Sequence, residues 1–208
     1  MESPALGLYV AASLALIATP GQDMLYVITR ALAQGRWAGV CSALGVCIGI
    51  LVHTAFAALG VGAVLQASET LFLLLKLAGA AYLVYLGVKL MLSRTPAREI
   101  GGAGARLAPL ALVWQGVLSN VTNPKMVLFF LAFLPQFVSP ASAQPTRDLV
   151  FLGVLYALLA LPIKAGVGLA AGTLSQRMVR STRALAWLNR VGGMVLVLVG
   201  LRIAALDR

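Results

Sequence analysis

The chain has 208 residues, of which 61% are hydrophobic and only 11% are charged. A soluble globular domain carries roughly 45–50% apolar and about 25% charged residues, so this composition excludes an ordinary soluble domain. A transmembrane helix needs about 20 mostly apolar residues to cross about 30 Å of hydrocarbon. We therefore predict an all-α integral membrane protein that forms a single transmembrane domain over residues 1–208, and no enzyme.

The formal net charge of +10 arises from 16 Lys and Arg residues against 6 Asp and Glu residues. The basic residues lie in short gaps between apolar runs and not along one basic face, so they indicate membrane topology and not binding to nucleic acid. Cys41 and Cys47 share one apolar run without CxxC spacing, which argues against a metal or redox site. No cofactor is predicted.

Six apolar segments follow one another along the chain, and we predict each as a transmembrane helix. The first is expected to be a retained span and not a signal peptide, because the only charge before it is Glu2, whereas a secretory signal starts with a positive segment. The predicted helices span residues 5–28, 38–65, 71–92, 107–137, 149–174 and 185–205.

The connections between these segments differ in charge, and this difference predicts orientation because Lys and Arg collect on the cytoplasmic side. The first, third and fifth connections are basic, whereas the second offers only Glu69 and the fourth has Arg147 beside Asp148. The N- and C-termini are therefore predicted to lie outside. The basic residues are Arg30 and Arg36; Lys89, Arg94, Arg98 and Arg106; and Arg177, Arg180, Arg183 and Arg190.

The two halves of the chain resemble each other. Residues 93–106 are rich in Gly, Ala and Arg and predict a cytoplasmic linker between repeat one, 1–92, and repeat two, 107–208. Residues 75–89 align without gaps on residues 188–202, with Gly79 on Gly192 and Gly87 on Gly200. Because each half has three spans, the second half would enter the membrane inverted, which predicts a 3+3 inverted repeat. The alternative is chance similarity between two helices rich in Gly and Leu.

The first and fourth predicted helices are each interrupted at a proline. Thr and Asn favour the N-cap position, and Pro favours the first helical turn, so a new half-helix is predicted to begin at Pro20 and at Pro124. The amide groups at such a start attract anions, carboxylates above all. Two opposed breaks predict a central substrate site, whereas ordinary proline kinks are the alternative for either break alone. The predicted substrate-binding residues are Thr19, Pro20, Gly21, Gln22, Asp23, Asn123, Pro124 and Lys125.

Ionisable residues inside the apolar runs are costly there, so they usually line a pathway or pair with one another. Asp23 and Lys125 adjoin the breaks, and we predict either an ion pair or separate contacts with the ammonium and the carboxylate of a zwitterionic substrate. The candidates for proton coupling are Asp23, Lys164 and His53. Lys164 is expected either to face the cavity or to snorkel to the headgroups, and Lys76 to snorkel. His53 either shuttles protons or only bonds to a neighbouring carbonyl.

Small residues in the second and fifth predicted helices permit close approach of other helices. Gly45 and Gly49 form a GxxxG pattern, and Gly166, Gly168 and Gly172 lie along the fifth helix. They predict either internal packing or the seam of a homodimer.

Three stretches resemble the LysE/RhtB family of amino-acid exporters. They read Thr-Pro-Gly-Gln-Asp-Met-Leu-Tyr-Val at 19–27, Lys-Leu-Ala-Gly-Ala-Ala-Tyr-Leu-Val-Tyr-Leu-Gly at 76–87, and Asn-Pro-Lys-Met-Val-Leu-Phe-Phe-Leu-Ala-Phe-Leu-Pro-Gln-Phe at 123–137. The resemblance implies a secondary transporter of the bacterial inner membrane that exports amino acids or close derivatives, driven by protons, with a homodimer as one assembly. Gln22 stands where the family often has proline.

From these observations we predict alternating access around one site. The substrate carboxylate would lie near Asn123 to Lys125 and its ammonium near Asp23, which is also the expected coupling group. Export of a metal cation is an alternative, although only Asp23 is both acidic and well inside a predicted span. A membrane thiol–disulfide oxidoreductase is a further alternative, but it would need a cysteine in each half.

Overall fold

The computed structural model describes residues 3–61, 69–92, 106–139, 142–173 and 182–205, and every regular element among them is helical. Most described boundaries lie close to those predicted, but the first predicted helix, expected over 5–28, continues to Gln34, and the predicted ends at 65 and 174 lie outside the described residues. The elements are α1 (Ser3–Ala18), α2 (Gln22–Gln34), α3 (Arg36–Phe56) with the π-helical η1 (Ala57–Val61), α5 (Glu69–Leu92), α6 (Pro109–Val121), α7 (Pro124–Leu128) with the π-helical η3 (Phe129–Phe133) and the 3₁₀-helical η4 (Leu134–Phe137), α8 (Pro145–Thr173) and α10 (Thr182–Ala205).

Two of the described helices, Arg36–Gly60 and Pro145–Thr173, are long and apolar enough to cross a membrane alone. Two bent pairs raise the number of candidate spans to four if each pair is one span: Leu6–Ala18 with Gln22–Gln34, bent by 48°, and Pro109–Val121 with Pro124–Phe137, bent by 55°. Leu77–Leu92 is a shorter apolar helix. The all-helical membrane class is thus supported, and the count of six spans stays a prediction.

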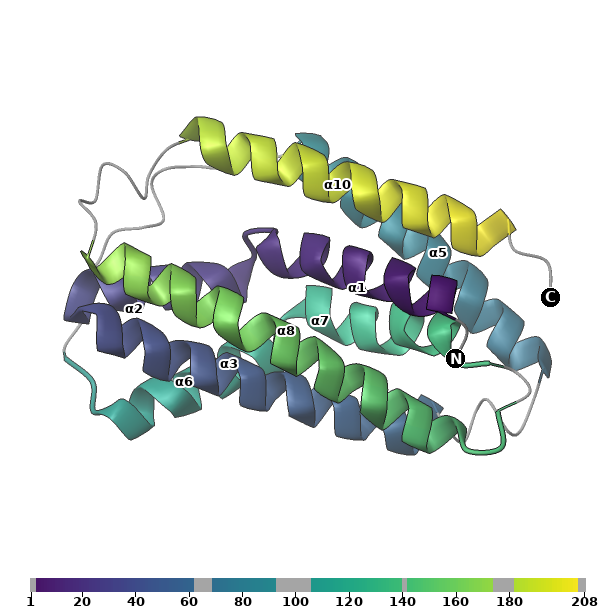
Figure 1. Ribbon diagram of the computed structural model, residues 1–208, viewed down its shortest axis with the longest axis horizontal. Helices are drawn as coiled ribbons and strands as arrows, with labels where there is room; N and C mark the ends of the chain where they lie inside the picture. The colour runs from purple at the N-terminus through teal and green to yellow at the C-terminus, as the bar shows by residue number, and fades with distance from the viewer. Residues whose placement is uncertain (1–2, 62–68, 93–105, 140–141, 174–181, 206–208) are drawn as a thin grey trace.

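The helices form two groups joined by the broken ones (Figure 1). In one group α3 packs against α2, α6 and α8, and in the other α5 packs along α10. Helix α1 contacts both α10 and α8, while η3 contacts α5. The breaks after α1 and α6 therefore lie in the middle of the molecule, between the two groups.

Small residues allow the helix backbones of the first group to approach one another closely. A side chain on Gly168 would strike the backbone of Gly39, and one on Gly45 would strike the backbone of Val113. The predicted small-residue pattern of α3 and α8 thus serves internal packing in this structure. Gly166 is different, because nothing lies within 4 Å of the place a side chain would take.

Aromatic side chains fill the core on one side of the breaks. Tyr9 lies against Phe133 and Phe137 with ring centroids 6.1 and 5.1 Å apart, and Phe129 lies 4.7 Å from Tyr156. All five of these rings are buried. We call them the aromatic cluster. Burying such rings is a large part of what stabilises a core, at about 25 cal/mol for each Å² removed from solvent.

Two predictions fall outside the described part of the chain. Residues 93–105 of the expected linker are not described, and neither is the side chain of Lys76.

Candidate functional site

The second break has the local structure that the sequence predicts. Asn123 is the N-cap residue of α7, and its side-chain carbonyl accepts a hydrogen bond of 3.0 Å from the backbone N–H of Lys125. Pro124 follows as the first helical residue, where its missing N–H costs nothing. The regular α-helix lasts only five residues before the chain widens into η3.

The first break differs from the prediction that Thr19 caps a helix starting at Pro20. Helix α2 starts at Gln22, and Gly21 is its N-cap residue with no side-chain cap. The Thr19 hydroxyl instead donates a hydrogen bond of 2.8 Å to the carbonyl of Ala15 in the last turn of α1. Thr19 therefore ends one helix, and the prediction that it begins the next is wrong.

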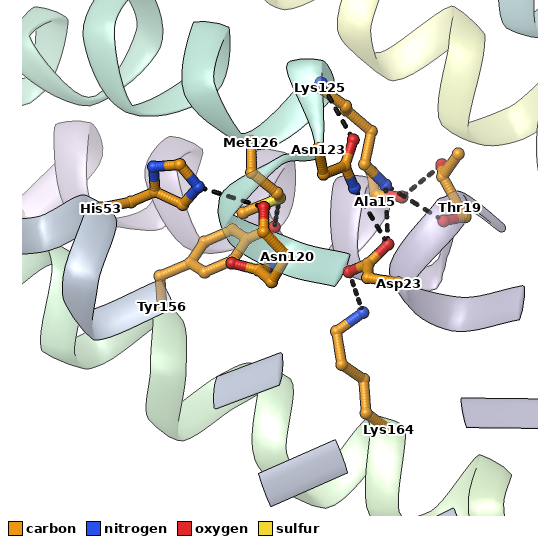
Figure 2. A network of polar contacts seen from close by, with 10 residues as sticks. All are labelled: Ala15, Thr19, Asp23, His53, Asn120, Asn123, Lys125, Met126, Tyr156 and Lys164. Atoms are coloured by element: carbon orange, nitrogen blue, oxygen red, sulfur yellow. Dashed lines mark hydrogen bonds and ion pairs between the residues drawn. The ribbon is translucent and has the colours of Figure 1, made fainter. Parts of the chain in front are cut away.

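Asp23, in the first turn of α2, contacts three polar side chains from the second half of the chain (Figure 2). Its Oδ2 accepts a hydrogen bond of 2.6 Å from Lys164 Nζ in α8. Its Oδ1 lies 3.9 Å from Lys125 Nζ and accepts a hydrogen bond of 3.4 Å from the Asn123 side chain. Asp23, Lys125 and Lys164 form what we call the ion triad.

The ion triad holds two cations and one anion, and its members differ in exposure. The side chains of Asp23 and Lys164 are 2% and 3% exposed, whereas that of Lys125 is 11% exposed. Lys164 therefore faces the protein interior and does not snorkel to the headgroups. A buried ion pair offsets the loss of hydration of its charges only when its geometry is good. Of the two lysines, the more buried one, Lys164, makes the shorter contact with Asp23. Lys125 is the accessible cation.

A cavity of about 330 Å³ lies against both breaks. All of the predicted substrate-binding residues except Gln22 and Asp23 line it: Thr19, Pro20, Gly21, Asn123, Pro124 and Lys125. Asp23 is not among the residues that line it and lies behind Lys125, so the expected contact between Asp23 and a substrate ammonium is not available in this conformation. The full lining is Leu16, Thr19, Pro20, Gly21, Leu25, Tyr82, Tyr85, Leu86, Lys89, Leu90, Asn123, Pro124, Lys125, Asn189 and Leu196.

His53 lies apart from the ion triad. Its Nε2 is 3.2 Å from the backbone carbonyl of Asn120, and its ring stacks on Phe130 with centroids 5.5 Å apart. Figure 2 shows this ring on the far side of Asn120 from Asp23. The geometry is that of a buried histidine bonded to a neighbouring carbonyl, the second of the two roles expected from the sequence.

The two cysteines are free thiols on α3. Cys47 is buried, with its Sγ 4.0 Å from the carbonyl oxygen of Ala157, and Cys41 is half-buried. Within the described ranges, no group of three or more His, Cys, Asp and Glu side chains lies close enough to hold a metal ion.

Besides five leucines, four residues with polar groups line the cavity that were not predicted from the sequence: Tyr82, Tyr85, Lys89 and Asn189. A tyrosine in an apolar helix has the same sequence pattern whether it faces lipid or a cavity, so the two tyrosines carried no signal. Asn189 did carry one, because an amide side chain in an apolar helix usually faces the interior.

The fold and the site define an all-helical membrane protein in which two broken helices meet at a cavity of about 330 Å³. The chain belongs to the LysE-type translocator family, whose model matches residues 14–206. It is 28% identical over 200 residues to a homoserine/homoserine lactone efflux protein of Salmonella typhimurium. The aligned region covers 95% of this chain and 94% of that protein.

Two further relatives are similar over most of the chain. A leucine efflux protein of Enterobacter sp. is 27% identical over 199 residues, covering 95% of this chain and 94% of that protein. An uncharacterized membrane protein of Pseudomonas aeruginosa is 36% identical over 184 residues, covering 81% of this chain and 84% of that protein. No solved structure matches.

Proposed function

We propose that this protein is a secondary transporter that exports amino acids or close derivatives across the bacterial inner membrane. The observation that carries the proposal is the cavity of about 330 Å³ that lies against both helix breaks and presents Lys125. Pockets for small molecules span about 300–1,000 Å³, so its size suits an amino acid. The names of the relatives from Salmonella and Enterobacter support the same substrate class.

We further propose six spans related as a 3+3 inverted repeat. The two bent helix pairs support this, because each half has its break in its first span. A side chain on Gly87 would strike the carbonyl of Gly193, and one on Gly200 would strike that of Ala80. In the alignment of residues 75–89 with 188–202, Gly87 corresponds to Gly200 and Ala80 corresponds to Gly193. The alignment therefore turns each of these two contacts into the other, as expected for antiparallel helices related by a pseudo-twofold axis.

The proposed orientation places the N- and C-termini outside. Helix α1 begins and α10 ends at the same end of the bundle, whereas α2 ends and α3 begins at the other (Figure 1). Arg30, Arg36 and Lys89 belong to that other end, which is therefore cytoplasmic by the charge rule. The exposed side chains of Trp37 and Trp187, both close to the first residue of their helix, suit the same interface.

In this orientation the structure suits the loading state of an alternating-access exporter. The cavity extends from the breaks to Lys89 in the last turn of α5, at the cytoplasmic end. In the opposite direction the aromatic cluster closes the path with buried rings. Export would require the two groups of helices to rock until the cluster parts and the cytoplasmic side closes.

Asp23 is the proposed site of proton coupling because it joins three elements. Its carboxylate ties α2 to α8 through Lys164 and to the second break through Asn123 and Lys125. Protonation of this carboxylate would weaken both ion pairs together. A proton could thus bias the packing of α2 against α8, which is the differential interaction that a coupled conformational change needs.

Efflux tests the proposal. Cells loaded with dipeptides of leucine or homoserine should release the free amino acid faster with the protein than without it. In proteoliposomes, Asp23→Asn should abolish dependence on an imposed proton gradient, and full dependence in this variant would refute the coupling role. Cys41→Ser, Cys47→Ser should retain efflux, because the mechanism uses no thiol. Loss of efflux in that double variant, with the protein still folded, would favour thiol chemistry.

A further inference from the structure

We propose that the cavity selects carboxylates with an uncharged, apolar side chain, that it does not require the α-ammonium group, and that it rejects cationic amino acids. This inference rests on the proposed function and names the substrate class of the same site. Two charged groups of the described chain face the cavity. They are Lys125 at the inner end and Lys89 in the last turn of α5, and no Asp or Glu is among the lining residues of the described chain.

The nearest acid is already occupied. Asp23 is 2% exposed and bonds to Lys164 at 2.6 Å. The amide of Asn123, which does line the cavity, is occupied as well, because its oxygen accepts from the Lys125 backbone and its nitrogen donates to Asp23. A substrate ammonium would therefore meet two lysines without a carboxylate to offset them. Charge of the same sign at this distance is repulsive, and weakly screened away from water.

Lys125 has the properties of the carboxylate anchor. Its ammonium carries three donors, of which one is directed at the carbonyl of Thr19 at 3.4 Å. Its distance to Asp23 is 3.9 Å, beyond hydrogen-bond length, so its bond to a substrate carboxylate would displace little. Lys164 meanwhile continues to neutralise Asp23. The two lysines thus have different tasks, one toward the protein and one toward the substrate.

The remainder of the wall accounts for the side-chain preference. Five leucines line the cavity with the rings of Tyr82 and Tyr85, and Lys89 Nζ already lies over the Tyr85 ring at 5.7 Å. An apolar substrate side chain gains free energy by displacing water from such a wall. The leucines are Leu16, Leu25, Leu86, Leu90 and Leu196.

A binding panel on the purified full chain in detergent tests this inference without requiring transport. The probes are leucine, N-acetyl-leucine, the keto acid analogue of leucine, leucinamide and lysine, measured by calorimetry. All three carboxylates without a cationic side chain should bind, and the acetylated and keto analogues should bind at least as tightly as leucine, because neither carries the ammonium that Lys89 and Lys125 repel. Leucinamide should bind about tenfold or more weakly than leucine, the loss expected for one charge-assisted hydrogen bond. Lysine should bind about tenfold or more weakly as well, because its side-chain ammonium adds a second positive charge near Lys89 and Lys125.

A pair of variants separates the role of Lys125 from its effect on folding. Lys125→Met should reduce the affinity for leucine to that of leucinamide, whereas Lys125→Arg should retain most of the difference between the two ligands. The inference is overturned if leucinamide or lysine binds the wild-type protein as tightly as leucine, if the acetylated and keto analogues fail to bind while leucine binds, or if no probe binds. A failure of efflux alone would instead count against the proposed function.

Discussion

Removing Asp23 should destabilise the protein more than removing either of its lysine partners. The ion triad contains two cations and one anion, so Asp23→Asn leaves two neighbouring cations without an anion in a buried site. Lys164→Met, in contrast, leaves Asp23 paired with Lys125. The double variant Asp23→Asn, Lys164→Met leaves only Lys125, the lysine that can be hydrated from the cavity.

The expected magnitudes follow from this charge balance. Breaking a buried ion pair by removing one partner costs about 3–5 kcal/mol, and the burial of Asp23 gives no reason to discount this for Asp23→Asn. Lys164→Met loses one charge-assisted hydrogen bond, about 1.5–3 kcal/mol. The double variant should return to within about 2 kcal/mol of the wild type, because replacing both partners of a buried pair is often nearly neutral.

The free energy of unfolding of the three variants can be compared in mixed detergent micelles, with Arg147→Gln as a surface control. Arg147 is exposed, and among the hydrogen bonds described for it, it bonds only to Gln144, the residue just before α8. This change should therefore stay within about 0.5 kcal/mol. The second substitution should restore stability to Asp23→Asn. A double variant that is as unstable as Asp23→Asn, or less stable, would refute the argument that the unpaired charge of Lys164 causes the destabilisation.

Two further predictions concern packing. Gly168→Val should destabilise the protein by about 1–3 kcal/mol through overpacking against the backbone of α3. Gly166→Val on the same helix has open space around it and should change the free energy of unfolding by less than about 0.5 kcal/mol. Equal effects of the two substitutions would contradict the contact between Gly168 and α3. Phe133→Ala should open the aromatic cluster, lower the free energy of unfolding by about 3–5 kcal/mol and raise the passive leak of leucine from proteoliposomes. Phe56→Ala, at an exposed ring, should leave the leak unchanged. A leak that is the same in both variants would exclude the aromatic cluster as the closed side.

Local chemistry made part of the site predictable. Asn-Pro at 123 and 124 specifies a helix start almost by itself, because the amide side chain caps the helix and the proline suits its first turn. Thr-Pro-Gly at 19–21 does not, since a threonine hydroxyl can equally bond back to the preceding turn, as it does here. The membrane class followed from composition alone.

The partners across the chain were harder to predict. The sequence placed Lys125 with Asp23 because both adjoin a break, yet the shorter bond is to Lys164. That contact depends on how α2 packs against α8, and hydropathy contains no signal for which face of a helix meets which neighbour. The same limit applies to Tyr82 and Tyr85, whose place on the cavity wall depends on the rotation of α5 about its axis.

The central claim is that the exported amino acid binds in the cavity between the two breaks, reached from the cytoplasm. The variant Leu86→Cys, on the cavity wall, tests this claim in a background with Cys41 and Cys47 replaced by serine. The control is Val88→Cys, at a 40% exposed position of the same helix. In inside-out vesicles a membrane-impermeant maleimide should label the cysteine at 86, and leucine should protect it while leaving the control unchanged. Labelling at 86 that leucine does not slow, in vesicles that still transport leucine into their lumen, would contradict the account.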